Sequence, residues 1–234
     1  MRYDPERHRR RSIRLRGYNY TQAGSYFITI CTQDRACLFG EVVSGDVRLN
    51  DAGRMIHAVW DELPNHYPGV ITDAFVVMPN HIHGIITLVG ADPRVCPDRT
   101  PAHPDVGADP RVCPDTTRVC PVPPQGQPQR VAPTLGLPDV VHRFKTITTK
   151  KYVDGVKQHN WQPFRGRLWQ RNYYEHIIRD ENALNKIREY IQTNPTRWAS
   201  DRENPFRQGD DPYEAWLSQL IRRTQENARR QSDP

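Results

Sequence analysis

Several features are missing from this chain, and each absence excludes a class of protein. No run of about 18 apolar residues is present, so the sequence predicts no membrane-spanning segment. Residues 1–16 are rich in arginine and lack the apolar stretch of a secretory signal. The five cysteines are odd in number and include no C-x-x-C pair, which argues against a disulfide framework and a zinc ribbon. We therefore expect a protein of the reducing cytoplasm.

Hydrophobic residues are also scarce, whereas positive charge is in excess. The hydrophobic content is 36% of 234 residues, which indicates that part of the chain does not pack into a core. The net charge of +6 favours an anionic partner, and nucleic acid is the commonest such partner of a soluble basic chain. The alternative is a positive charge that serves solubility alone.

The segment at about 91–134 interrupts the chain with low-complexity sequence. The nine residues of 90–98 are repeated letter for letter at 107–115, and 12 of the 21 prolines lie between Pro93 and Pro138. Such a segment cannot supply a packed core. We expect a disordered insertion looped out of one catalytic domain at 25–200. A basic arm at 1–24 precedes this domain, and a charged tail at 201–234, with one possible helix, follows it.

The remaining sequence predicts alternating strands and helices. Apolar and β-branched runs predict strands at 26–32, 71–78, 81–89 and 161–169, and a small hairpin at 38–49. Helical spacing predicts helices from Asn50 or Asp51 to 63, from Asp139 to 153, from 173 onwards and over 182–193. This order is close to a split β-α-β pattern. The expected fold is therefore α+β, an antiparallel sheet with helices packed on one face.

Two histidines share one predicted strand. His81 and His83 follow Pro79-Asn80, which reads as a tight connection between two strands. Alternate side chains of a strand point to the same face, so the two imidazoles lie roughly 7 Å apart on one side. Two imidazoles so placed can converge on one divalent cation. Two histidines that merely cap a sheet surface are the alternative.

A second pair of side chains lies near the end of a predicted helix. Tyr190 and Asn194 are four residues apart, so they project from one face. If that face meets the strand of His81 and His83, an amide oxygen joins the imidazoles as a ligand for Mg²⁺ or Mn²⁺. Tyr190 is then placed to attack a phosphate held there. The neighbouring phenols of Tyr173 and Tyr174 are rival nucleophiles, and a half-buried structural aromatic is the alternative for Tyr190.

The motifs together resemble a known family. The stretches F-V-V-M-P-N-H-I-H-G at 75–84, W-Q-R-N-Y-Y-E-H-I-I-R-D at 169–180 and E-Y-I-Q-T-N-P at 189–195 resemble the single-tyrosine HUH transposases, and most of all the REP-associated tyrosine transposases. The resemblance implies a ferredoxin-like domain that cleaves and joins single-stranded DNA near hairpins through a 5′-phosphotyrosine. It implies His81 and His83 as metal ligands, Tyr190 as nucleophile and Asn194 as third ligand, with no small-molecule cofactor and a monomeric or homodimeric protein.

Basic side chains outside these motifs are candidates for DNA contact. They lie in the N-terminal arm, on the helix that follows the insertion and just before the last helix. The set is Arg10, Arg11, Arg14, Arg16, Arg143, Lys145, Lys150, Lys151 and Arg179. Two alternatives to a transposase stay open: a nuclease that uses metal-activated water, and a hairpin-DNA-binding protein without turnover.

Overall fold

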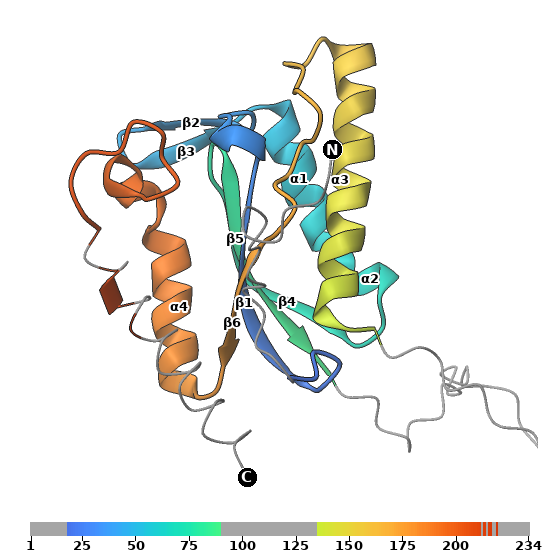
Figure 1. The fold of residues 1–234 in the computed structure, drawn as a ribbon, viewed down its shortest axis with the longest axis vertical. Coiled ribbons are helices and arrows are strands. Elements are labelled where there is room, and N and C mark those ends of the chain that lie inside the picture. Colours follow the sequence, from blue (N-terminus) through green and yellow to red (C-terminus); the bar gives the residue numbers. More distant parts are fainter. Residues whose placement is uncertain (1–17, 90–134, 212, 214, 217–218, 220–234) are drawn as a thin grey trace, which may run out of the picture. The chain divides into compact units, whose positions relative to one another are not determined.

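A computed structural model of the chain describes residues 18–89, 135–211, 213, 215, 216 and 219. The centre of this part is a four-stranded antiparallel sheet of order β4-β5-β1-β6 (Figure 1). Its strands are β1 (Gly24–Cys31), β4 (Val70–Val77), β5 (His81–Leu88) and β6 (Tyr174–Ile178). Residues 1–17 of the predicted arm at 1–24 and the predicted insertion at 91–134 lie outside the described residues.

One face of the sheet is covered by two helices, α1 (Asp51–Asp61) and α3 (Leu137–His159). They follow β1 and β5 in the chain, so the element order is β-α-β-β-α-β, and the sheet order is that of the ferredoxin-like fold. Trp60 of α1 lies flat on Phe75 and against Gly84, where a Cβ would come within 2.5 Å of the indole. The predicted α+β class and ferredoxin-like sheet are confirmed.

The opposite face is covered by α4 (Glu181–Thr193). Its apolar stripe, Ile187, Tyr190 and Ile191, packs on Phe27 of β1 and Ile85 of β5. The expectation of helices on one face therefore holds for α1 and α3 but is wrong for α4. The reason is that β1 and β5 carry large apolar side chains on both faces, and both faces need cover.

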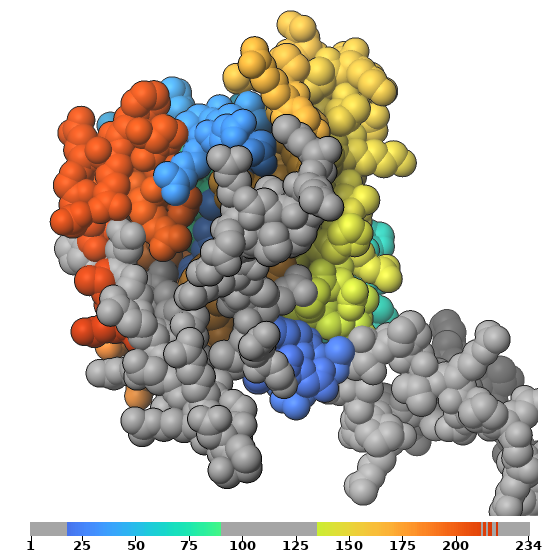
Figure 2. Space-filling model, in the orientation of Figure 1, coloured from blue at the N-terminus to red at the C-terminus, as the bar shows by residue number. Residues whose placement is uncertain are grey.

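Four smaller elements lie around the end of the sheet where β5 begins: η1 (Gln33–Arg35), the hairpin β2 (Gly40–Val43) and β3 (Asp46–Leu49), and η2 (Pro195–Ser200). The short helix α2 (Leu63–His66) lies at the other end, just before β4. The predicted hairpin is confirmed. Asn50 caps α1 as predicted, since its side chain accepts a hydrogen bond from the backbone N–H of Gly53. In the space-filling view, α3 and the segment after α4 lie on opposite sides of one face (Figure 2).

Three expectations need correction. Residues 161–169 form no strand beyond a single bridge between Thr32 and Trp169. The predicted helix start at 173–179 is instead the strand β6, because these residues pair with β1 from Ser25 to Thr29. Residues 201–211, assigned by composition to a charged tail, bury Asp201, Glu203, Asn204 and Asp211 against the folded domain.

Candidate active site

The two histidines of the H-I-H motif point to the same face of β5, as the strand period predicts. His83 lies opposite Thr29 in the pairing with β1, and His81 lies opposite Cys31. Both side chains are buried, and their Nε2 atoms are 3.0 Å apart. Ile82 between them points into the core on the other face. The geometry therefore presents two imidazole nitrogens to one point.

Hydrogen bonds from neighbouring residues fix the orientation of both rings. Nδ1 of His81 donates to Oδ1 of Asn80 at 2.8 Å, and Nδ1 of His83 is hydrogen-bonded to Oγ1 of Thr29 at 2.8 Å. The Asn80 amide is itself held, because its Nδ2 donates to the backbone carbonyls of Arg35 and Glu203. With Nδ1 of His81 protonated, Nε2 of neutral His81 carries a lone pair directed at His83. Such partners orient histidine ligands in metal sites.

The electrostatics keep this pair neutral. Burial lowers the pKa of His81, although the charges of Asp201 and Glu203 oppose the shift. Burial and then the neighbouring His81 lower the pKa of His83 well below its ordinary value. Neutral imidazole is the form that coordinates a metal ion. The histidine pair is therefore in its ligand form at neutral pH.

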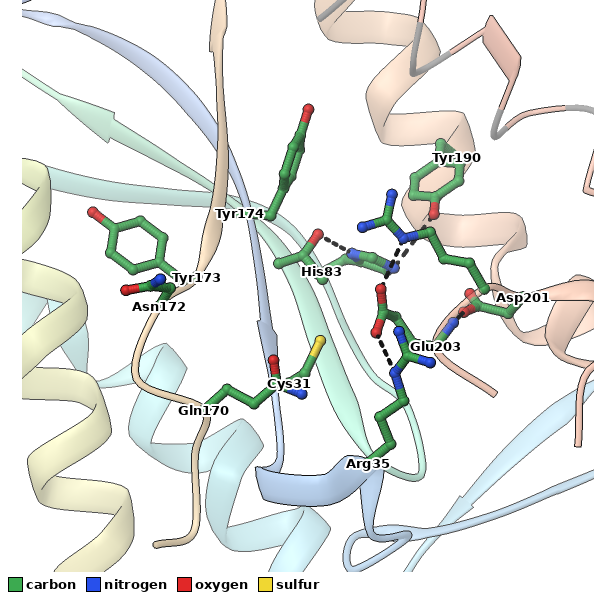
Figure 3. A pocket seen from close by; sticks show the side chains of 12 residues that line it. Cys31, Arg35, His83, Gln170, Asn172, Tyr173, Tyr174, Tyr190, Asp201 and Glu203 are labelled. Carbon is green, nitrogen blue, oxygen red and sulfur yellow. Dashed lines mark hydrogen bonds and ion pairs between the residues drawn. The ribbon is translucent and has the colours of Figure 1, made fainter. Parts of the chain in front are cut away.

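Helix α4 brings Tyr190 to the histidines. The side chain of Asp180 caps the helix by accepting from the N–H of Ala183, and the stripe that contains Tyr190 faces the sheet. The hydroxyl of Tyr190 lies 3.5 Å from Nε2 of His83 and points toward it (Figure 3). Burial, followed by the charge of Asp201, raises the pKa of Tyr190 above its ordinary value. The phenol is therefore protonated and faces the histidine pair.

The chain beyond α4 adds a carboxylate that the sequence did not reveal. Asp201 is buried, and its Oδ2 lies 3.9 Å from Nε2 of His81. Ligand atoms of His81, His83 and Asp201 all lie within 4.8 Å of one another. Asp201 escaped prediction because it lies in a polar stretch without helical or strand periodicity, and no spacing signal singles it out.

Asn194 lies beside this carboxylate. Its Nδ2 donates to Oδ2 of Asp201 at 3.0 Å, and both residues are buried. Its Oδ1 is also buried and has no hydrogen-bond partner among the residues that the structure describes. An unpartnered buried carbonyl oxygen is costly unless something binds it. The donors of this cluster are therefore two imidazole nitrogens, a carboxylate and an amide oxygen, a set that suits a divalent cation such as Mn²⁺ or Mg²⁺.

A cavity of about 250 Å³ opens onto this cluster. It lies between the stretch 170–174 on one side and α4 with residues 201–203 on the other (Figure 3). The rival phenols Tyr173 and Tyr174 line it too, and burial raises the pKa of Tyr174. Tyr190 is the phenol that is hydrogen-bonded to the histidine pair.

The predicted DNA-contacting residues separate into distinct environments. Lys145 donates to the backbone carbonyls of Gln170, Arg171 and Asn172, so it fastens α3 to the stretch beside the cavity. The guanidinium of Arg143 lies over the ring of Tyr67, and Lys151 pairs with Glu62 at 3.6 Å. Lys150 and Arg179 are exposed. Four predicted residues, Arg10, Arg11, Arg14 and Arg16, lie outside the described residues.

Lys150 belongs to a wider groove of about 700 Å³ between α3 and residues 166–171. Gln170 lines both this groove and the cavity of the histidine cluster. The groove is basic along both walls. Its charged or titratable residues are His142, Lys145, Lys150, Asp154, Lys157, Arg167 and Arg171.

Comparisons with known proteins find similarity to transposases and to a protein of unstated function. The family model of IS200-like transposases matches residues 129–194, which contain α3, β6 and α4. A Haemophilus influenzae protein of unstated function is 39% identical over 200 residues, covering 86% of this chain and 96% of the relative. A second Haemophilus influenzae protein, whose name assigns it to the REP-associated tyrosine transposases, is 25% identical over 76% of this chain and 74% of its own length.

A solved structure is similar to part of the fold. It is a REP-associated tyrosine transposase bound to a REP hairpin, 17% identical, with a TM-score of 0.44. The match covers 77% of this chain and 71% of that one.

Proposed function

We propose that this chain, which belongs to the IS200-like transposase family, is a DNA transposase that nicks and rejoins single-stranded DNA through a covalent bond to Tyr190. The observation that carries the proposal is the approach of the Tyr190 hydroxyl to Nε2 of His83 at 3.5 Å. Tyr190 and His83 line one cavity, and the proposal places the scissile phosphodiester there.

His81, His83 and Asp201 would hold a divalent ion, with Oδ1 of Asn194 as a further oxygen donor. The buried, unpartnered Oδ1 and the paired Nε2 atoms support this assignment. When bound, such an ion supplies Lewis-acid polarisation of a phosphate oxygen and neutralises developing charge. Asn80 and Thr29 keep the imidazoles turned toward the site, and Asn194 keeps the carboxylate of Asp201 in place.

The chemical step is an in-line displacement at phosphorus. Oη of Tyr190 forms the new bond to phosphorus, and the bond from phosphorus to the 3′ oxygen breaks. The phenolic proton leaves to solvent as the new bond forms, since the raised pKa excludes a free phenolate at neutral pH. The 3′ oxygen takes up a proton, and the 5′-phosphate stays on Tyr190. Attack by a 3′ hydroxyl on this ester reverses the step and rejoins DNA.

We propose that the DNA duplex next to the nick binds in the basic groove between α3 and residues 166–171. Lys150, Lys157 and Arg167 line it, and unspecific phosphate contacts are what such side chains provide. Gln170 connects this groove to the cavity at Tyr190, so a strand that leaves the duplex has a short path to the nucleophile. A hairpin with a single-stranded flank fits both surfaces.

The experiment determines which part of the cleaved strand stays covalently attached to the protein. Hairpin-bearing single strands from the flanks of the gene, labelled at either end, are incubated with the protein and Mn²⁺ and separated on denaturing gels. A 5′-phosphotyrosine retains the 3′ part of the strand, so an adduct is expected with the 3′ label alone. Cleavage without any adduct would instead indicate a nuclease that uses activated water, and binding without cleavage a protein without turnover.

A further inference from the structure

A group of two arginines and one glutamate lies at the mouth of the active-site cavity. Oε2 of Glu203 accepts from Nε of Arg35 at 3.1 Å, and its Oε1 accepts from Nε of Arg202 at 2.8 Å. The carboxylate is buried, with its side chain 8% exposed, whereas each arginine side chain is 48% exposed. All three residues line the cavity that also holds His83 and Tyr190.

Glu203 holds the two guanidinium groups in position by accepting a hydrogen bond from each. Burial alone would raise the pKa of Glu203, but the hydrogen bond and charge of Arg202 and the charge of Arg35 lower it. The backbone of Glu203 is held in place as well. Its N–H donates to Oδ1 of Asp201, and its carbonyl oxygen accepts from Nδ2 of Asn80. The Arg35 guanidinium is thus held beside the cavity through its Nε, with its side chain about half exposed.

The backbone at Arg35 is held in an unusual conformation. Asp34 and Arg35 have φ values of 57° and 55°, in the left-handed region that non-glycine residues rarely adopt. The carbonyl of Arg35 accepts from Nδ2 of Asn80, whose Oδ1 accepts from His81. The strained turn therefore places the guanidinium at the cavity mouth and also supports a residue that orients the histidine pair. Strain of this kind is typical of functional sites.

We propose that Arg35, held by Glu203, binds a phosphodiester group of the DNA strand adjacent to the one that Tyr190 attacks. That the ligand is a DNA strand rests on the proposed function. The anion site itself is additional to the site at Tyr190. Guanidinium groups bind phosphate oxygens through paired N–H donors. Because Nε of Arg35 donates to Glu203, the phosphate would be bound by the Nη groups of Arg35. The site would set the position of the strand relative to Tyr190.

The test measures equilibrium binding, so it needs no cleavage. All proteins carry Tyr190→Phe, and fluorescence anisotropy of a fluorescein-labelled dT12 is followed in Mg²⁺ over a range of NaCl concentrations. Arg35→Gln should weaken binding about tenfold. It should also make the slope of log K against log salt shallower by about 0.7, the value for one lost phosphate contact on a single strand.

Two variants separate phosphate binding from a structural role. Arg35→Lys keeps the charge and should restore the salt slope. Its affinity should lie between that of the Tyr190→Phe parent and that of the Arg35→Gln variant. Arg48→Gln removes the same charge from an exposed residue of β3 and should change affinity less than twofold. A lower melting temperature for Arg35→Gln with an unchanged salt slope would overturn the proposal, as would failure of the parent to bind dT12.

The outcomes also separate this proposal from the proposed function. If the chain with Tyr190 intact never forms a covalent adduct, but Arg35→Gln in the Tyr190→Phe background shows the expected change in slope, the tyrosine mechanism is removed and the phosphate site is kept. An adduct in the chain with Tyr190 intact, together with an unchanged slope in the Tyr190→Phe background, would do the reverse.

Discussion

The hydroxyl of Tyr190 and Nε2 of His83 lie 3.5 Å apart, although 107 residues separate them in the chain. The contact joins the helix that covers one face of the sheet to a central strand. Phe27 packs against both, with its ring stacked on His83 and edge-on to Tyr190. Stability of α4 on the sheet is therefore a condition for placing the phenol.

The metal site can be tested without measuring activity. In the parent chain, Mn²⁺ should raise the melting temperature, because a ligand that binds the folded state alone stabilises it. His81→Ala combined with His83→Ala should fold, lose this response and lose Mn²⁺-dependent cleavage. Differential scanning calorimetry with and without Mn²⁺ measures the response. Equal stabilisation of the parent and the double variant would place the ion elsewhere.

Asp201 and Asn194 should contribute unequally to the metal site. Asp201→Asn removes a charged ligand and should weaken Mn²⁺ binding by roughly 10- to 100-fold. Asn194→Ala removes a neutral donor and should weaken it less. Isothermal titration with Mn²⁺ compares the two variants. Unchanged affinity in Asp201→Asn would show that the carboxylate does not touch the ion.

The ion pair between Arg188 of α4 and Asp73 of β4 should stabilise the packing of α4 on the sheet. Nε and Nη2 of Arg188 donate to the Asp73 carboxylate at distances down to 2.6 Å, with side chains 36% and 28% exposed. Because the pair is partly exposed, Arg188→Gln should cost about 1 kcal/mol of unfolding free energy in urea titration. The matched control Arg54→Gln breaks the more exposed pair with Asp51 and should cost less.

The same pair has a defined pH dependence. The hydrogen bond from Arg188 lowers the pKa of Asp73. The stabilisation is therefore present above the ordinary aspartate pKa and is lost as the pH falls through the depressed value. An equal cost of Arg188→Gln at neutral pH and in strong acid would contradict this assignment.

His176 should make the domain sensitive to mild acid. Burial and then Arg179 lower the pKa of His176 from 6.5 to about 4. Stability from the neutral ring is complete above the unfolded pKa of 6.5 and is lost as the pH falls toward 4. In EDTA, His176→Gln should lose less stability than the parent between these values, by on the order of 3 kcal/mol. Identical pH profiles from urea titrations would contradict the prediction.

The sequence predicted those parts of the site that follow from short-range periodicity. The strand period placed His81 and His83 on one face, and the helical period placed Tyr190 and Asn194 together. Neither period states which face of the sheet a helix covers. That choice depends on large apolar residues on both faces of β1 and β5, which α4 must cover.

The sequence failed where burial depends on distant partners. Residues 201–203 read as a charged tail, yet Asp201 is buried because Asn194 and the backbone of Glu203 satisfy its carboxylate. In the same way, β6 contains Glu175 and His176 and has no clear apolar alternation. It becomes a strand because the edge of β1 needs a hydrogen-bonding neighbour.

The most direct test of the account is whether Tyr190→Phe still forms the covalent protein–DNA adduct. This change removes one hydroxyl and should leave packing on Phe27, Mn²⁺ binding and hairpin binding intact. It should abolish both strand cleavage and the adduct on denaturing gels, whereas Tyr173→Phe and Tyr174→Phe should still form measurable adduct. An adduct that persists in Tyr190→Phe and disappears in Tyr174→Phe would contradict the assignment of α4 as the nucleophile helix.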